Sequence, residues 1–122
     1  MIGNPALIED ALHRHPKLRL NLMHLGAPFL EDTIAMLSLY PNVSVDTGAV
    51  SWIMPRRQFH DYLRRLVDAG FSDRIMFGSD QMFWPEAIGL AIEGVESATF
   101  LTAADKQAIF HDNAARFYRL AA

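Results

Sequence analysis

Cysteine is absent from this 122-residue chain. Its absence excludes disulfides and thiolate metal sites and is compatible with a reducing compartment, so we expect a cytoplasmic protein. An excess of basic charge is also missing: 11 Lys and Arg stand against 14 Asp and Glu, for a net charge of -3. Without a basic cluster, nucleic acid is not an expected partner.

Long hydrophobic runs are lacking too. No apolar stretch approaches the length that a membrane-spanning helix requires. The first 15 residues carry two acids and no continuous apolar region, so they do not have the pattern of a signal peptide. The chain is nevertheless 51% hydrophobic, which is enough for one core. We therefore expect a single domain over residues 1–122.

Strand and helix patterns alternate along the chain. Three short runs have the apolar alternation or the β-branched content of strands: 18–24 (LRLNLMH), 42–47 (NVSVDT) and 74–79 (RIMFGS). Helices are expected to begin near Asn4-Pro5, Pro28, Pro55, Trp84-Pro85 and Thr102. Thr102 with Asp105 resembles a capping box, and the helix that it opens is expected to reach about residue 120.

Parallel pairing follows from this order, because strands separated by helices are joined by right-handed crossovers. The carboxyl ends of such strands share one rim, where ligands bind. Here the three strand ends are His24-Leu25-Gly26, Asp46-Thr47-Gly48 and Ser79-Asp80-Gln81. The sequence thus predicts an α/β fold that brings two carboxylates and one imidazole to one edge.

Four segments occur in an order that resembles a known family: LNLMHLGAPFLED, PNVSVDTGAV, RIMFGSDQMFWPEA and NAARFYRL. They are similar to the C-terminal part of the amidohydrolase-related proteins, which are metal-dependent TIM-barrel hydrolases and decarboxylases. The resemblance implies that the three strands are about strands six to eight of a (β/α)8 barrel, followed by the closing helix. A full barrel has about 250 residues, so we expect this chain to form a partial barrel.

The resemblance also implies roles for two residues. Asp80 matches the family's eighth-strand acid, a metal ligand and proton-transfer group, and His24 matches a catalytic or substrate-orienting histidine. The implied cofactor is a divalent metal, Zn²⁺ or Mn²⁺, which suits mixed His and Asp ligation. The alternatives are that Asp80 caps the next helix and that His24 is a buried imidazole bonded to a carbonyl.

The family's first-strand H-x-H pair should lie upstream of these segments. The chain does contain one H-x-H, His13-Arg14-His15, but it ends a helix just before Pro16. That position precedes the first strand and belongs to the opposite rim. We therefore do not expect His13 and His15 to bind the metal, and two ligands alone should hold it weakly.

Other polar and aromatic residues are weaker candidates. Asp46, followed by Thr47 and Gly48, fits a turn in which the carboxylate bonds nearby backbone. Trp52 and Trp84 lie in the expected loops after the second and third strands and are candidates for the wall of a substrate pocket, with ordinary packing as the alternative. Arg56 is a candidate for binding a substrate carboxylate, with solvation as the alternative.

The expected function is hydrolysis or decarboxylation of a small carboxylate-bearing molecule, with Asp80 and His24 as catalytic and metal-binding residues. Two alternatives are an inactive partial barrel and a module whose sheet edges pair with another chain. Three parallel strands leave two open edges, and an inner face with Leu20, Leu22, Val43 and Val45 or their neighbours would have no opposing wall. We therefore expect self-association or pairing with the missing barrel part.

Overall fold

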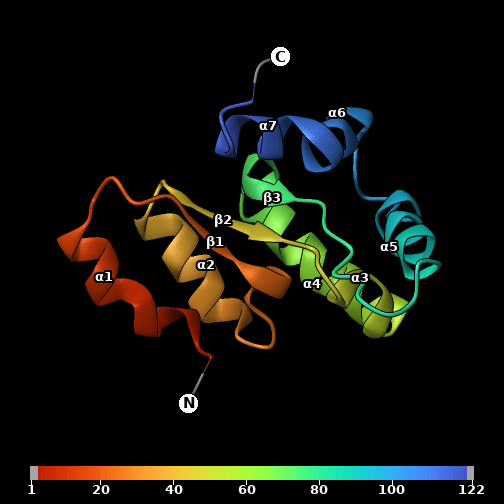
Figure 1. Ribbon diagram of the computed structural model, residues 1–122, viewed down its shortest axis with the longest axis horizontal. Helices are drawn as coiled ribbons and strands as arrows, with labels where there is room; N and C mark the ends of the chain where they lie inside the picture. Colours follow the sequence, from red (N-terminus) through yellow and green to blue (C-terminus); the bar gives the residue numbers. More distant parts are fainter. Residues whose placement is uncertain (1–2, 121–122) are drawn as a thin grey trace.

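The computed structural model describes residues 3–120, which form a three-stranded parallel sheet with helices on both faces (Figure 1). The strands are β1 (Leu20–Leu22), β2 (Val43–Asp46) and β3 (Ile75–Met76), in that spatial order. The α-helices are α1 (Glu9–Arg14), α2 (Leu30–Leu39), α3 (Val50–Ile53), α4 (Arg56–Asp68), α5 (Ala87–Glu96), α6 (Ala103–Gln107) and α7 (Asn113–Phe117). Shorter turns of 3₁₀ helix are η1 (Pro5–Ile8), η2 (Met23–Gly26) and η3 (Ser72–Arg74), and η4 (Ala108–Asp112) is a π-helical turn.

Most helix starts are where the sequence predicts them. The Asn4 side chain accepts a hydrogen bond from the Ala6 backbone N–H, with Pro5 in the first helical position. Thr102 and Asp105 form a complete capping box before α6. The strands are shorter than expected, and the unexpected helix α3 lies between β2 and α4. The last helix is also interrupted by η4, the π-helical turn between α6 and α7.

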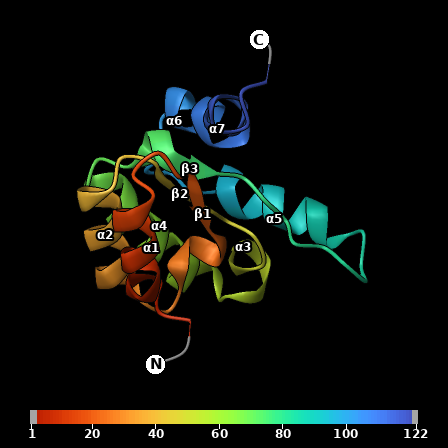
Figure 2. The same ribbon diagram turned by 60° about the vertical axis from the view of Figure 1, so that its left-hand side comes forward.

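The sheet has one apolar and one polar face. Register pairs Leu20 with Val43, and it aligns Leu22, Val45 and Ile75 across the three strands. Val43, Val45 and Ile75 are fully buried in the core shared with the helices. Figure 2 shows α1, α2 and α4 on this side. Burying each of these side chains contributes roughly 1.5–3 kcal/mol, so this face makes a substantial contribution to stability.

The polar face presents Asn21, Ser44 and Asp46, which alternate with the buried residues of the same strands. Helix α7 lies next to β3 and shields part of this face from there (Figures 1 and 2). The Arg19 guanidinium lies 5.4 Å from the centre of the Phe117 ring of α7. The expectation of an unopposed apolar inner face is therefore wrong, because Val43 and Val45 point to the helices and Asn21, Ser44 and Asp46 take the other side.

Within residues 3–120, no helix is both long enough and apolar enough to cross a membrane.

Candidate functional site

The first strand ends in a left-handed turn that decides where His24 points. Strict alternation along β1 would place His24 on the apolar face with Leu20 and Leu22. Instead the strand stops at Leu22, and His24, Leu25 and Gly26 have φ values of 59°, 55° and 70°. The turn reverses the chain and brings His24 to the polar side, where its Nε2 lies 3.8 Å from Asp80 Oδ2.

Tyr62 holds this turn from the core side. Its hydroxyl, on α4, donates a hydrogen bond of 3.0 Å to the Leu25 carbonyl. Burial raises the pKa of Tyr62 to about 12, so the hydroxyl keeps its proton and acts as a donor at neutral pH. The turn that presents His24 is thus anchored to helix α4, which packs into the core through Phe59, Leu63 and Leu66.

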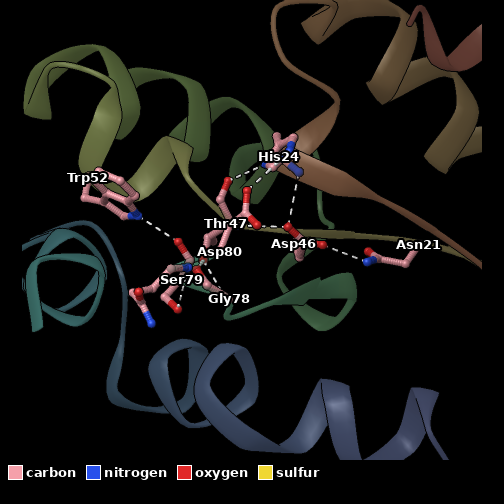
Figure 3. A network of polar contacts seen from close by, with 10 residues as sticks. Asn21, His24, Asp46, Thr47, Trp52, Gly78, Ser79 and Asp80 are labelled. Atoms are coloured by element: carbon pink, nitrogen blue, oxygen red, sulfur yellow. Dashed lines mark hydrogen bonds and ion pairs between the residues drawn. The ribbon is translucent and has the colours of Figure 1, made fainter. Parts of the chain in front are cut away.

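Asp46 braces the turn from the strand side (Figure 3). One carboxylate oxygen accepts hydrogen bonds from the backbone N–H groups of His24 (3.1 Å) and Gly48 (2.9 Å). The other accepts from the Asn21 side-chain amide at 2.7 Å. The expected local turn is therefore present, and it has a second role that sequence did not indicate, which is to fix the backbone of the histidine.

Gly48 orients the imidazole. Its carbonyl lies 2.7 Å from His24 Nδ1, and because a carbonyl only accepts, Nδ1 carries the proton and Nε2 presents its lone pair. The same carbonyl accepts from Val50 N–H at 2.6 Å, closing a γ-turn in which Ala49 has a φ of 59° and a ψ of -50°. The expected alternative, a histidine bonded to a carbonyl, is thus true of Nδ1, whereas Nε2 faces Asp80.

The loop that carries Asp80 is tied to the end of β2. Thr47 Oγ1 donates to the Gly78 carbonyl and accepts from the Gly78 N–H, each at 3.1 Å. The Ser79 carbonyl accepts from the Ala49 N–H at 3.1 Å and from Trp52 Nε1 at 2.7 Å. Asp80 itself has a φ of 54° and does not cap α5, whose N-cap position is Glu86.

Backbone strain gathers at this rim. Five non-glycine residues in the described part of the chain have positive φ: His24, Leu25, Ala49, Asp80 and Arg119. The first four lie where the three strands end. Such conformations cost of order 1–3 kcal/mol each and concentrate at functional sites, where the surrounding contacts enforce them.

The side chains enclose a polar pocket of about 260 Å³ on the polar face of the sheet. Its polar lining comes from Asn21, His24, Asp46, Asp80 and Tyr118, and no lysine or arginine of residues 3–120 lines it. Asn21 Oδ1 is buried and has no hydrogen-bond partner within residues 3–120. His24 and Asp80 are about one-third exposed, with side-chain accessibilities of 36% and 35%.

His24 and Asp80 fit a divalent cation, because they offer an imidazole nitrogen and a carboxylate oxygen close together in the pocket. The backbone carbonyl bonded to the other imidazole nitrogen is the usual arrangement behind a metal-binding histidine. However, the described residues contain no cluster of three or more His, Asp or Glu side chains arranged to hold a metal. The second carboxylate, Asp46, is occupied by three hydrogen bonds.

Of the other candidate residues, the two tryptophans lie beside the site and Arg56 does not. Trp52 and Trp84 line a second hollow beside Asp80, although Trp52 lies in helix α3 rather than in a loop. Arg56 donates to Ser97 Oγ at 2.7 Å and lines neither hollow, so its position does not support substrate binding. His13 Nε2 lies 3.1 Å from the hydroxyl of Tyr40, a residue just before the start of β2. The H-x-H therefore lies at the rim where the strands begin, opposite His24, as expected.

Comparison with known proteins agrees with this architecture. Two crystal structures of an amidohydrolase from Burkholderia multivorans, one with bound zinc and one with bound HEPES, superpose with a TM-score of 0.68 each. Their sequence identities are 27% and 26%, and each covers 93% of this chain. The prediction of parallel β/α units from a TIM barrel is confirmed.

The chain is much shorter than these relatives. It spans 48% and 49% of the two Burkholderia chains. Protein fluG of Emericella nidulans is 28% identical over 89 residues, which are 73% of this chain and 10% of that protein. The family model for Amidohydrolase matches residues 3–120. The chain therefore belongs to the amidohydrolase family.

Proposed function

We propose that this chain supplies part of the active site of a metal-dependent hydrolase, with His24 and Asp80 as metal ligands. The carrying observation is the pairing of His24 Nε2 with Asp80 Oδ2 at 3.8 Å, in a pocket that no lysine or arginine of residues 3–120 lines. A family relative that holds zinc supports the choice of Zn²⁺, with Mn²⁺ as the second candidate. The proposed substrate is a small carboxylate-bearing molecule.

Each residue has a defined task in this proposal. Gly48 O keeps the proton on His24 Nδ1, so Nε2 stays available as a donor of electrons. Asp80 accepts a proton from the attacking water, as a partly exposed carboxylate beside the reacting group can do. Asp46 and Thr47 hold the two loops in register. A bound divalent ion supplies Lewis-acid polarisation of the substrate carbonyl.

The number of ligands favours a shared site. His24 and Asp80 supply two ligands, whereas catalytic zinc sites generally use three protein ligands. We propose that further ligands come from barrel strands outside these 122 residues, and that the isolated chain holds the metal weakly. The alternative, an inactive partial barrel, would keep the fold and bind no metal at His24 and Asp80.

Calorimetric titration of the purified chain with Zn²⁺ separates these two possibilities. Asp80→Asn and His24→Asn are suitable variants, because asparagine tolerates the positive φ of both positions. We expect weak binding by the wild type and at least about tenfold weaker binding by each variant, a loss of about 1.4 kcal/mol. In a complete barrel, Asp80→Asn should retain the fold and abolish turnover.

A matched control is available in His13 and His15, the H-x-H that ends the first helix. Replacing His13 and His15 with alanine should leave the zinc affinity unchanged, since both lie at the other rim. Wild-type zinc affinity in Asp80→Asn, or loss of affinity in the control, would contradict the proposed ligands.

A further inference from the structure

A second hollow adjoins the polar pocket, and Asp80 lines both. Its volume is about 230 Å³, and its walls are mainly apolar, formed by Trp52, Ile53, Met82, Phe83, Trp84 and Ala87. We call this hollow the apolar pocket. It lies at the same rim as His24, since Trp52 follows the end of β2 and Met82 to Trp84 follow the end of β3.

The two indole rings form a fixed corner. Their centroids are 6.0 Å apart and their planes are inclined by 80°. Trp52 Nε1 already donates to the Ser79 carbonyl, one residue before Asp80, so its polar atom is satisfied. The Trp84 backbone N–H donates to Gln81 Oε1, which closes the loop that carries Met82 and Phe83. The corner therefore offers the apolar surfaces of two indole rings to an occupant.

Exposed apolar side chains form the rim of this pocket. Phe83 is 92% exposed and Met82 is 72% exposed. Exposed aromatic and methionine side chains beside a hollow are costly to leave in water and are typical of binding surfaces. A small occupant suits the volume, because an apolar cavity of about 150 Å³ in another protein is large enough to bind benzene.

We infer that the apolar pocket receives a ring-bearing, apolar part of the substrate whose hydrolysable group lies beside His24 and Asp80, in the polar pocket. This inference rests on the proposed function and deepens it, because it assigns the substrate to the class of aryl- or cycloalkyl-substituted esters, amides or lactones. Asp80 marks the junction: a substrate that spans both pockets has its apolar end against Trp52 and Trp84 and its polar end at the carboxylate.

Tryptophan emission measures occupancy of this pocket directly, because both tryptophans of the chain line it. The probe is phenylacetamide, a neutral amide with one ring, and acetamide is the matched compound without the ring. Each is titrated into the 122-residue chain in the presence of a chelator and again with Zn²⁺. We expect a saturable emission change with phenylacetamide and none with acetamide at equal concentration.

Two variants localise the binding. Phe83→Ala removes an exposed rim side chain that the fold does not need, and it should weaken phenylacetamide binding roughly fivefold. Leu39→Ala removes a similarly exposed side chain at the end of α2, which does not line the pocket, and should leave the binding unchanged.

The outcomes separate this inference from the proposed function. Binding of phenylacetamide in the presence of the chelator supports the inference about the apolar pocket, even if the chain binds no zinc. Binding of zinc without binding of phenylacetamide overturns this inference and leaves the proposed metal site unaffected. Equal responses to the two amides, or equal losses in both variants, would also overturn it. So would emission that changes with protein concentration and not with ligand, because the aromatic surface would then be an interface between chains.

Discussion

Asp46 contributes to the site through other residues rather than by contact with a substrate. Its carboxylate accepts the backbone N–H groups of His24 and Gly48 and the amide of Asn21. These three bonds connect β1, β2 and the left-handed turn. A charged acceptor at this position is strongly favoured, because hydrogen bonds to ionised groups are about twice as strong as neutral ones.

Replacing Asp46 tests this bracing role. Asp46→Ala leaves two backbone N–H groups and the Asn21 amide without an acceptor, and we expect unfolding free energy to fall by about 3 kcal/mol. Asp46→Asn keeps a carbonyl for the two N–H groups, and a flip of Asn21 presents its unpaired Oδ1 to the new amide. That variant should lose only about 1 kcal/mol.

Urea denaturation followed by circular dichroism measures both losses. Zinc affinity should fall in Asp46→Ala, in which the His24 turn loosens, and stay close to the wild type in Asp46→Asn. Equal losses of stability in the two variants would show that the charge, and not the acceptor geometry, holds the turn.

At the scale of elements, the apolar pocket depends on how closely α3 approaches α5. Gly94 permits this approach, because a Cβ at this position would overlap the Ser51 carbonyl oxygen of α3. Trp52 also belongs to α3, and Ala87 of α5 lines the same pocket. The spacing of these two helices therefore sets the width of the corner between the indole rings.

A pair of glycines on α5 tests this packing. Gly94→Ala should force the helices apart and destabilise the protein by about 1–3 kcal/mol, the usual cost of overpacking. Gly89 has open space around its Cβ position, so Gly89→Ala should raise stability by up to about 1 kcal/mol through helix propensity. Thermal unfolding measures the stability of both variants. A loss of stability in Gly89→Ala together with no change in Gly94→Ala would contradict this account of the packing.

Elements whose signals are local could be predicted from the sequence. Asn4-Pro5 and Thr102 with Asp105 act through backbone groups two or three residues away, and the structure confirms both caps. The short helix α3 was missed, because it is held by contacts to the Ser79 carbonyl, 27 residues from Trp52. The predicted length of the first strand was wrong for a related reason. The chain leaves the strand before His24 through a left-handed turn, which Asp46 and Tyr62 stabilise from elsewhere in the sequence.

The candidate site shows the same division. Residue types at strand ends predicted that His24, Asp46 and Asp80 share one rim, and the structure brings them together. The bracing by Asn21 and the orienting carbonyl of Gly48 were missed. Both depend on which face of β1 is polar, and two leucines at alternate positions, Leu20 and Leu22, do not say whether they face helices or a barrel interior.

On the scale of the molecule, the sheet formed by residues 3–120 has one open edge instead of the two expected. The Phe77 N–H donates to the Ile109 carbonyl, and the Asn113 amide donates to the Ile75 carbonyl, so the C-terminal helices cover the β3 edge. In the described part of the chain, β1 pairs only with β2. Its outer edge is a short template for another strand, and Leu18 and Met23 flank it in exposed positions.

We therefore predict that self-association, if the chain assembles alone, proceeds through the β1 edge rather than through an apolar inner face. Leu18→Lys places a charge beside this edge, which is how natural proteins discourage strand pairing. The matched control is Leu39→Lys, an exposed leucine at the far end of α2. Light scattering over a dilution series should show a larger species for the wild type and for Leu39→Lys, and a monomer for Leu18→Lys. A wild type that stays monomeric at every concentration would refute self-association. If Leu18→Lys dimerises as strongly as the wild type, the interface does not lie at the β1 edge.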